Sequence, residues 1–175
     1  MDAIVDMQGF IGKNNTFVPK EVTVLLVEGA MVVKEHTYLI HPPYAFGDLS
    51  ATQQRTVNWA KNNYHSFGWQ DGNVPYVDFV SRLKMILTNV KQIYVKGKSK
   101  GCFLRQHIHA CIPIFHIDNP GFKLKLDKHC TDDYKYACML HQVSFRKACS
   151  RQNAYVILNA LCDEHLTAQQ RLERL

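Results

Sequence analysis

Three apolar segments at the start of the chain have the pattern of β-strands. They cover Ala3–Phe10, Glu21–Gly29 and Met31–Pro42, and the second is rich in β-branched residues, as is typical of a central strand. Gly29 and Ala30 separate the second segment from the third, which predicts a hairpin turn. The pattern therefore predicts a three-stranded antiparallel meander.

The rest of the chain alternates between helical and strand-like spacing of apolar residues. Ser50 is a plausible N-cap for the first of the helices. Helices are predicted at 49–64, 76–90, 99–108 and 144–162, and strands at 91–97 and 111–118. Antiparallel strands followed by alternating helices and strands indicate an α/β protein with a mixed sheet and flanking helices. A ribonuclease-H-like fold has this order of elements.

The composition is that of a globular protein, with 46% hydrophobic and 21% charged residues among 175. We expect one ribonuclease-H-like domain over residues 1–162 and a helical tail over 163–175. No apolar run approaches the roughly 20 residues of a membrane-spanning helix. The first residues lack the charge and apolar pattern of a signal peptide. The sequence therefore predicts a cytoplasmic or nuclear protein without a membrane segment.

Positive charge is concentrated in one segment of the chain, whose net charge is +6. No acidic residue lies between Asp78 and Asp118. The same segment carries seven basic residues: Arg82, Lys84, Lys91, Lys96, Lys98, Lys100 and Arg105. The turn after the predicted strand 91–97 is its densest part, and such a cluster attracts phosphate backbones. We predict that Lys96, Lys98, Lys100 and Arg105 face RNA; the alternative is a solvated basic surface.

Three potential metal ligands occur close together in the stretch ACMLHQVSFRKACS, as Cys138-x₂-His141-x₇-Cys149. In one continuous helix, Cys138 and Cys149 would lie roughly 16 Å apart, which is too far for one zinc ion. A shared metal therefore requires a helix that begins near Ser144, with Cys149 on its second turn. Structural zinc takes four ligands, and Cys130 is a local candidate for the fourth. Buried thiols and one hydrogen-bonded histidine are the alternative.

Three stretches resemble the Maelstrom domain, a ribonuclease-H-like domain of the small-RNA pathway in animal germ cells. They are the Cys-His-Cys spacing, the strand in PKEVTVLLVEG and the strand–turn–helix segment IYVKGKSKGCFL. The resemblance implies a structural Zn²⁺ bound by Glu21, Cys138, His141 and Cys149. It also implies binding of single-stranded RNA, a role in small-RNA or transposon silencing, and an unconventional type of RNA cleavage.

The acids of a standard exonuclease of this fold are incomplete. Such enzymes use four acids around two Mg²⁺ ions, the first two as Asp-x-Glu on the first strand. Here Asp6 is followed by Gln8, and Arg146 stands where a late Asp would follow His141. Asp118 is an isolated candidate. Three histidines could act as general acids or bases in principle: His65, His107 and His109. We expect each of them to be a surface histidine. The sequence therefore assigns no catalytic residue.

Three functions remain open at this point. The first is a zinc-stabilised, RNA-binding domain with lost or unconventional nuclease activity. The second is a protein-interaction scaffold, for which the aromatic loop Asn62–Gly72 could supply the docking surface or could pack onto the domain itself. The third is an active Mg²⁺-dependent exonuclease with rearranged acids. Salt-dependent RNA binding separates the first from the second. Degradation of RNA that is lost in Asp6→Ala would favour the third.

Overall fold

The computed structural model describes residues 1–118 and 149–172, with side chains described as far as Asp163. The strands are β1 (Asp2–Ile11), β2 (Phe17–Glu28), β3 (Met31–His41), β4 (Val74–Pro75), β5 (Ile93–Val95) and β6 (Ile114–His116). The helices are α1 (Ala51–Ala60), α2 (Tyr76–Leu87), α3 (Lys98–His107) and α4 (Ser150–Leu172), and a π-helical turn at Lys61–His65 follows α1. None of the helices in the described part of the chain is long and apolar enough to cross a membrane.

The six strands form one mixed sheet in the order β4-β3-β2-β1-β5-β6. β1, β2 and β3 pair antiparallel, which confirms the predicted meander, and Gly29 takes a positive φ of 60° in the turn between β2 and β3. β5 pairs parallel to β1, with Val95 opposite Val5. Because β5 ends at Val95, the chain leaves the sheet beside Asp6 and enters α3 there. The predicted α/β class with flanking helices is confirmed.

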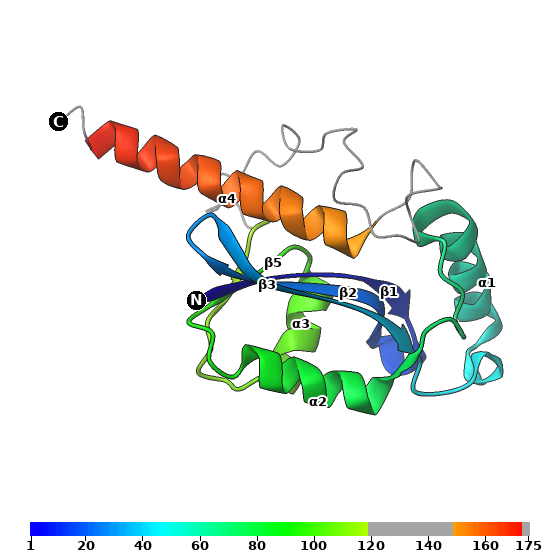
Figure 1. Ribbon diagram of the computed structural model, residues 1–175. Helices are drawn as coiled ribbons and strands as arrows, with labels where there is room; N and C mark the ends of the chain where they lie inside the picture. The colour runs from blue at the N-terminus through cyan, green and yellow to red at the C-terminus, as the bar shows by residue number, and fades with distance from the viewer. Residues whose placement is uncertain (119–148, 173–175) are drawn as a thin grey trace.

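Helices cover both faces of the sheet (Figure 1). Residues of β1 alternate between the two faces, as the pleat of a strand requires. Ala3, Val5 and Met7 pack with residues of α2 and α3, whereas Ile4 packs with Leu25 and residues of α4. The long helix α4 therefore covers the face of the sheet that also carries Asp6 and Gln8.

The boundaries of several predicted elements need correction. β2 begins at Phe17, so Glu21 lies inside the strand and does not open it. The helix after Ser50 ends at Ala60. Ser50 is its N-cap, as predicted, and it also forms a capping box with Gln53. β4 is only two residues long and has no periodicity to predict it. α4 begins at Ser150, and residues 144–148 of the predicted helix lie outside the described residues.

The aromatic loop Asn62–Gly72 packs onto the domain. Phe67 and Trp69 are buried, and Trp69 joins a small core with residues of β1, β2 and α1. The loop is held by Lys20, a completely buried lysine whose ammonium donates to the carbonyls of Ile40, Trp69 and Asp71. Burial lowers the pKa of Lys20 to about 8. Of the two readings of this loop, the structure favours internal packing.

Candidate functional site

A band of polar side chains crosses β1, β2 and β3 beneath the first turns of α4. Its members stand at every second position of these strands and occupy the same face of the sheet, where Asp6 pairs with Thr23, Gln8 with Glu21, and Thr23 with Thr37. We call this set the polar band: Asp6, Gln8, Glu21, Thr23, Glu35 and Thr37. Buried polar groups are costly unless they are hydrogen-bonded, so this concentration beneath one helix marks the candidate site.

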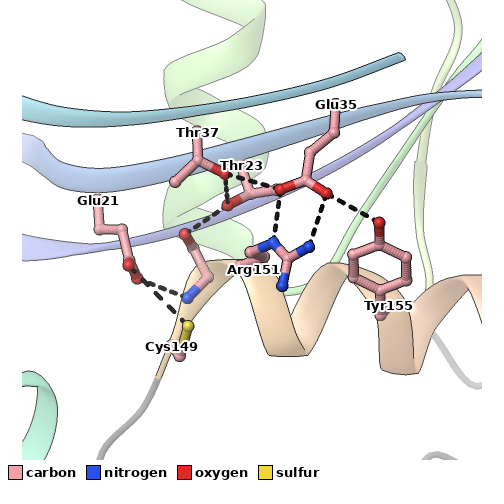
Figure 2. Close-up of polar contacts among 8 residues, drawn as sticks. Glu21, Thr23, Glu35, Thr37, Cys149, Arg151 and Tyr155 are labelled. Carbon is pink, nitrogen blue, oxygen red and sulfur yellow. Dashed lines mark hydrogen bonds and ion pairs between the residues drawn. The ribbon is translucent and has the colours of Figure 1, made fainter. Parts of the chain in front are cut away.

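Glu21 and Cys149 lie in contact at one end of the polar band (Figure 2). The Cys149 sulfur is 4.0 Å from Glu21 Oε1, and the backbone N–H of Ser150 donates to Glu21 Oε2 at 2.7 Å. A carboxylate oxygen and a thiolate on one tetrahedral zinc are about 3.6 Å apart, given the usual bond lengths. The two side chains therefore need to move only a few tenths of an ångström to share a metal ion.

The other predicted ligands, Cys138 and His141, lie outside the described residues, as does Cys130. Glu21 is only 2% exposed, so it is not a solvent-facing glutamate at the edge of the sheet. Cys149 immediately precedes α4, which corrects its expected place on the second turn of that helix. No group of three or more Asp, Glu, His or Cys that could hold a metal is assembled within residues 1–118 and 149–163.

Polar contacts at the middle of the band attach the start of α4 to β2 and β3. Arg151 binds Glu35 through two nitrogens, at 2.5 and 3.1 Å, and Tyr155 donates to the same carboxylate at 2.8 Å (Figure 2). Thr23 shares a hydrogen bond with Ser150 at 2.9 Å. Burial raises the pKa of Glu35, but the hydrogen bonds from Arg151 and Tyr155 outweigh it and hold the pKa below its ordinary value. The carboxylate is therefore charged and bound at neutral pH.

Asp6 lies on the β1 side of the band, opposite Thr23, and is 1% exposed. Its Oδ1 accepts a hydrogen bond from the Lys100 ammonium at 2.5 Å. Its Oδ2 accepts from Gln8 Nε2 at 3.2 Å and from Asn153 Nδ2 at 3.0 Å. Burial raises the pKa of Asp6 above its ordinary value, although the charge and hydrogen bond of Lys100 oppose this shift. Three elements, β1, α3 and α4, thus meet at one carboxylate.

The residues around Asp6 do not fit a divalent-metal centre. Mg²⁺ takes oxygen ligands and is bound through carboxylates, whereas the neighbours of Asp6 are an amide at Gln8, an amide at Asn153 and an ammonium at Lys100. The pair Asp6–Lys100 already has zero net charge, so the carboxylate no longer offers a divalent cation a net attraction. Two-metal hydrolysis of the standard kind therefore has no support at this position.

The structure divides the predicted RNA-facing residues into two groups. Lys96, Lys98 and Arg105 are exposed, whereas Lys100 is turned inward with its side chain 20% exposed. The expectation of three lysines on one open surface therefore needs adjustment, because Lys100 is held by a buried carboxylate. Lys96 and Lys98 remain at the turn that joins β5 to α3.

The remaining catalytic candidates do not join the site. His65 is completely buried, contrary to the expectation of a surface histidine. His107 is partly buried and lies 3.3 Å from the hydroxyl of Tyr76, and burial lowers its pKa. His109 is exposed, with Nδ1 3.1 Å from the sulfur of Cys111. Asp118 is exposed at the end of the described segment, and Arg146 lies outside it.

One solved structure with the same architecture is exonuclease X in complex with 5′-overhanging duplex DNA. The TM-score is 0.51 at 14% sequence identity, and the match covers 97% of this chain and 93% of that chain. The chain has a ribonuclease-H-like fold. No protein-family model matches it, and no curated protein matches it significantly. At this identity the likeness establishes the fold alone.

Proposed function

We propose that this chain is a nucleic-acid-binding domain that does not hydrolyse its ligand by the two-metal mechanism. The observation that carries the proposal is the arrangement at the end of β5. Lys100 points inward and neutralises Asp6, while Lys96 and Lys98, on the same turn, point to solvent. Lys100 occupies the position beside Asp6 where a catalytic metal ion would bind. Lys96 and Lys98 keep the positive charge that attracts a phosphate backbone.

The basic segment 82–105 supplies the binding surface in this proposal. In open α/β sheets, ligands bind beyond the carboxyl ends of the strands, and Lys96 directly follows the carboxyl end of β5. Exonuclease X, which shares the fold, is bound to duplex DNA in its structure. Single-stranded RNA is the ligand that we favour, because the resemblance to the Maelstrom domain implies it. Contacts to phosphates predict weak sequence preference.

Titration of a labelled RNA with the wild-type protein tests this proposal. Fluorescence anisotropy at several salt concentrations should show binding that weakens steeply as salt increases, because bound phosphates release counterions. The logarithm of affinity should fall linearly with the logarithm of salt, with a slope of about −0.7 for each phosphate contacted on a single strand. Single-stranded RNA should bind more tightly than an RNA duplex of equal length. Absence of salt-dependent binding would favour the protein-interaction alternative.

A structural zinc ion is the second part of the proposal. Glu21 and Cys149 would bind it together with Cys138 and His141, and the contact between Glu21 and Cys149 supports this set. Bound there, the ion would cross-link β2 to the segment that precedes α4. Four protein ligands leave no open coordination position, so the role is structural. A place in small-RNA or transposon silencing is the wider function that the resemblance suggests.

The two alternatives receive less support. The loop Asn62–Gly72 buries Phe67 and Trp69, which removes most of its aromatic surface from the proposed docking role. Trp59 and Tyr64 remain exposed nearby and are the residues that a protein partner would contact. An active Mg²⁺-dependent exonuclease would need acids beside Asp6, where Gln8 and Lys100 stand.

A further inference from the structure

The ammonium of Lys100 lies beside Asp6, the one acid that the first strand keeps of the Asp-x-Glu pair that two-metal nucleases use. Asp6 is the buried acid of β1, and Lys100 is the group that neutralises it, at 2.5 Å. Asn153 of α4 and Gln8 of β1 complete the shell around the same carboxylate. The geometry points to a permanent internal cation: Lys100 takes the place of the divalent ion beside Asp6, and the wild-type chain binds no such ion there.

The position of Lys100 in its helix supports this inference. α3 begins at Lys98, so Lys100 lies in its first turn. Positive side chains are unfavourable at that end, because the helix dipole is positive there. Helix formation therefore does not explain a lysine at this position, whereas the ion pair with Asp6 does. The register of the sheet brings the two together, since Val95 at the end of β5 lies opposite Val5.

The inferred role has a structural consequence. In a metal-dependent centre the cation arrives from solution, whereas here it is part of the chain and fixes the start of α3 to β1. Lys100 is thereby a positioning residue for the turn that carries Lys96 and Lys98. This inference rests on the same Asp6–Lys100 pair as the proposed lack of two-metal hydrolysis, but its tests use no nucleic acid, so the ion pair and RNA binding can fail separately.

Amine labelling of the wild-type protein tests the ion pair directly. With a reagent that acylates lysine, peptide mass spectrometry should show Lys96 and Lys98 modified at least about tenfold faster than Lys100, because a buried carboxylate holds the Lys100 ammonium. In Asp6→Asn the labelling of Lys100 should rise towards that of Lys98. Labelling of Lys100 as fast as Lys96 in the wild-type protein would overturn the inference.

Mn²⁺ binding then tests the replacement of the metal. The double variant Gln8→Glu/Lys100→Ala gains a carboxylate and loses the ammonium, so it should bind about one Mn²⁺ per chain in electron paramagnetic resonance titrations. The matched control Gln8→Glu/Lys98→Ala has the same net charge but keeps Lys100, and it should not bind. Adding Asp6→Asn to the first variant should abolish binding. Three results would overturn the inference. The first is Mn²⁺ binding by the wild-type protein that is lost in Asp6→Asn. The others are equal Mn²⁺ binding by the control and no binding by a folded double variant. If the double variant does not fold, the wild-type titration and the labelling result decide.

Discussion

Replacing Cys149 or His141 is expected to have the largest effect on the stability of this protein. Cys149→Ser and His141→Ala should each give insoluble protein or lower the melting temperature by more than about 10 °C. Apparent binding free energies of structural zinc are about 10–16 kcal/mol. The whole stability of a domain is about 5–15 kcal/mol. Loss of the metal would therefore remove a contribution comparable to the total.

Metal content separates this effect from a simple packing defect. Elemental analysis of the wild-type protein should give one zinc per chain. Glu21→Gln keeps an oxygen that can accept from the Ser150 N–H but loses the charged ligand, so zinc content should fall. Cys130→Ser and Cys102→Ser are matched thiol controls and should retain zinc. If the wild-type protein contains no zinc, and Cys149→Ser and His141→Ala fold as well as the wild-type protein, the zinc site does not exist. Loss of zinc in Cys130→Ser with retention in Glu21→Gln would replace Glu21 by Cys130 as fourth ligand.

Charge reversal at the β5–α3 turn is expected to have the largest effect on RNA affinity. Each hydrogen bond to a charged group contributes about 1.5 kcal/mol or more, which is about tenfold in affinity. Lys96→Glu/Lys98→Glu should therefore weaken binding about a hundredfold at moderate salt. The salt slope should become shallower by about 1.4, or about 0.7 for each lost contact. Anisotropy titrations at three or more salt concentrations measure both quantities.

The control for this variant carries the same change of charge on other elements. Lys34 on β3 and Arg55 on α1 are exposed and lie outside the basic segment 82–105. Lys34→Glu/Arg55→Glu should bind RNA within about threefold of the wild-type protein, apart from the long-range effect of net charge, which salt screens. Lys100 is left unchanged in both variants, because its loss would leave Asp6 buried without a counterion. Equal loss of affinity in the control would place the RNA elsewhere on the protein.

Much of the fold was predictable because it depends on local patterns. The β-branched run in β2 and the turn at Gly29 define the meander, and Ser50 with Gln53 caps α1 as its residue types suggest. Because β2 is buried along nearly its whole length, its β-branched composition identifies it as a strand. β4 was missed because two residues have no period.

The candidate site was only partly predictable, because its contacts join residues that are distant in sequence. Asp6 could be identified from the first strand. That Lys100 neutralises it depends on the parallel register of β1 and β5, which no local pattern reports. The pairing of Glu35 with Arg151 likewise joins β3 to α4 across 116 positions. A polar residue at every second position of a buried strand was the available signal for the polar band, as at Asp6 and Gln8.

Buried ionisable residues account for the other differences between the structure expected from the sequence and the structure observed. Lys20 is charged by type and would be placed on the surface from sequence alone, yet three backbone carbonyls accept its hydrogen bonds. His65 is buried between aromatic rings, with Phe10 and Phe67 as its neighbours. For Lys20, tertiary contacts provide the compensation that burial of a charged group requires, whereas His65 Nδ1 accepts a local hydrogen bond from the backbone N–H of Phe67.

We propose above all that this ribonuclease-H-like domain binds RNA and does not hydrolyse it by the two-metal mechanism. The most direct test follows an end-labelled single-stranded RNA, in one low-salt reaction with Mg²⁺, for both retention by the wild-type protein and length on a denaturing gel. Full-length RNA that stays bound and is released by added salt is the result that we predict. RNA shortened in a Mg²⁺-dependent reaction, with the activity lost in Asp6→Ala, would contradict the claim.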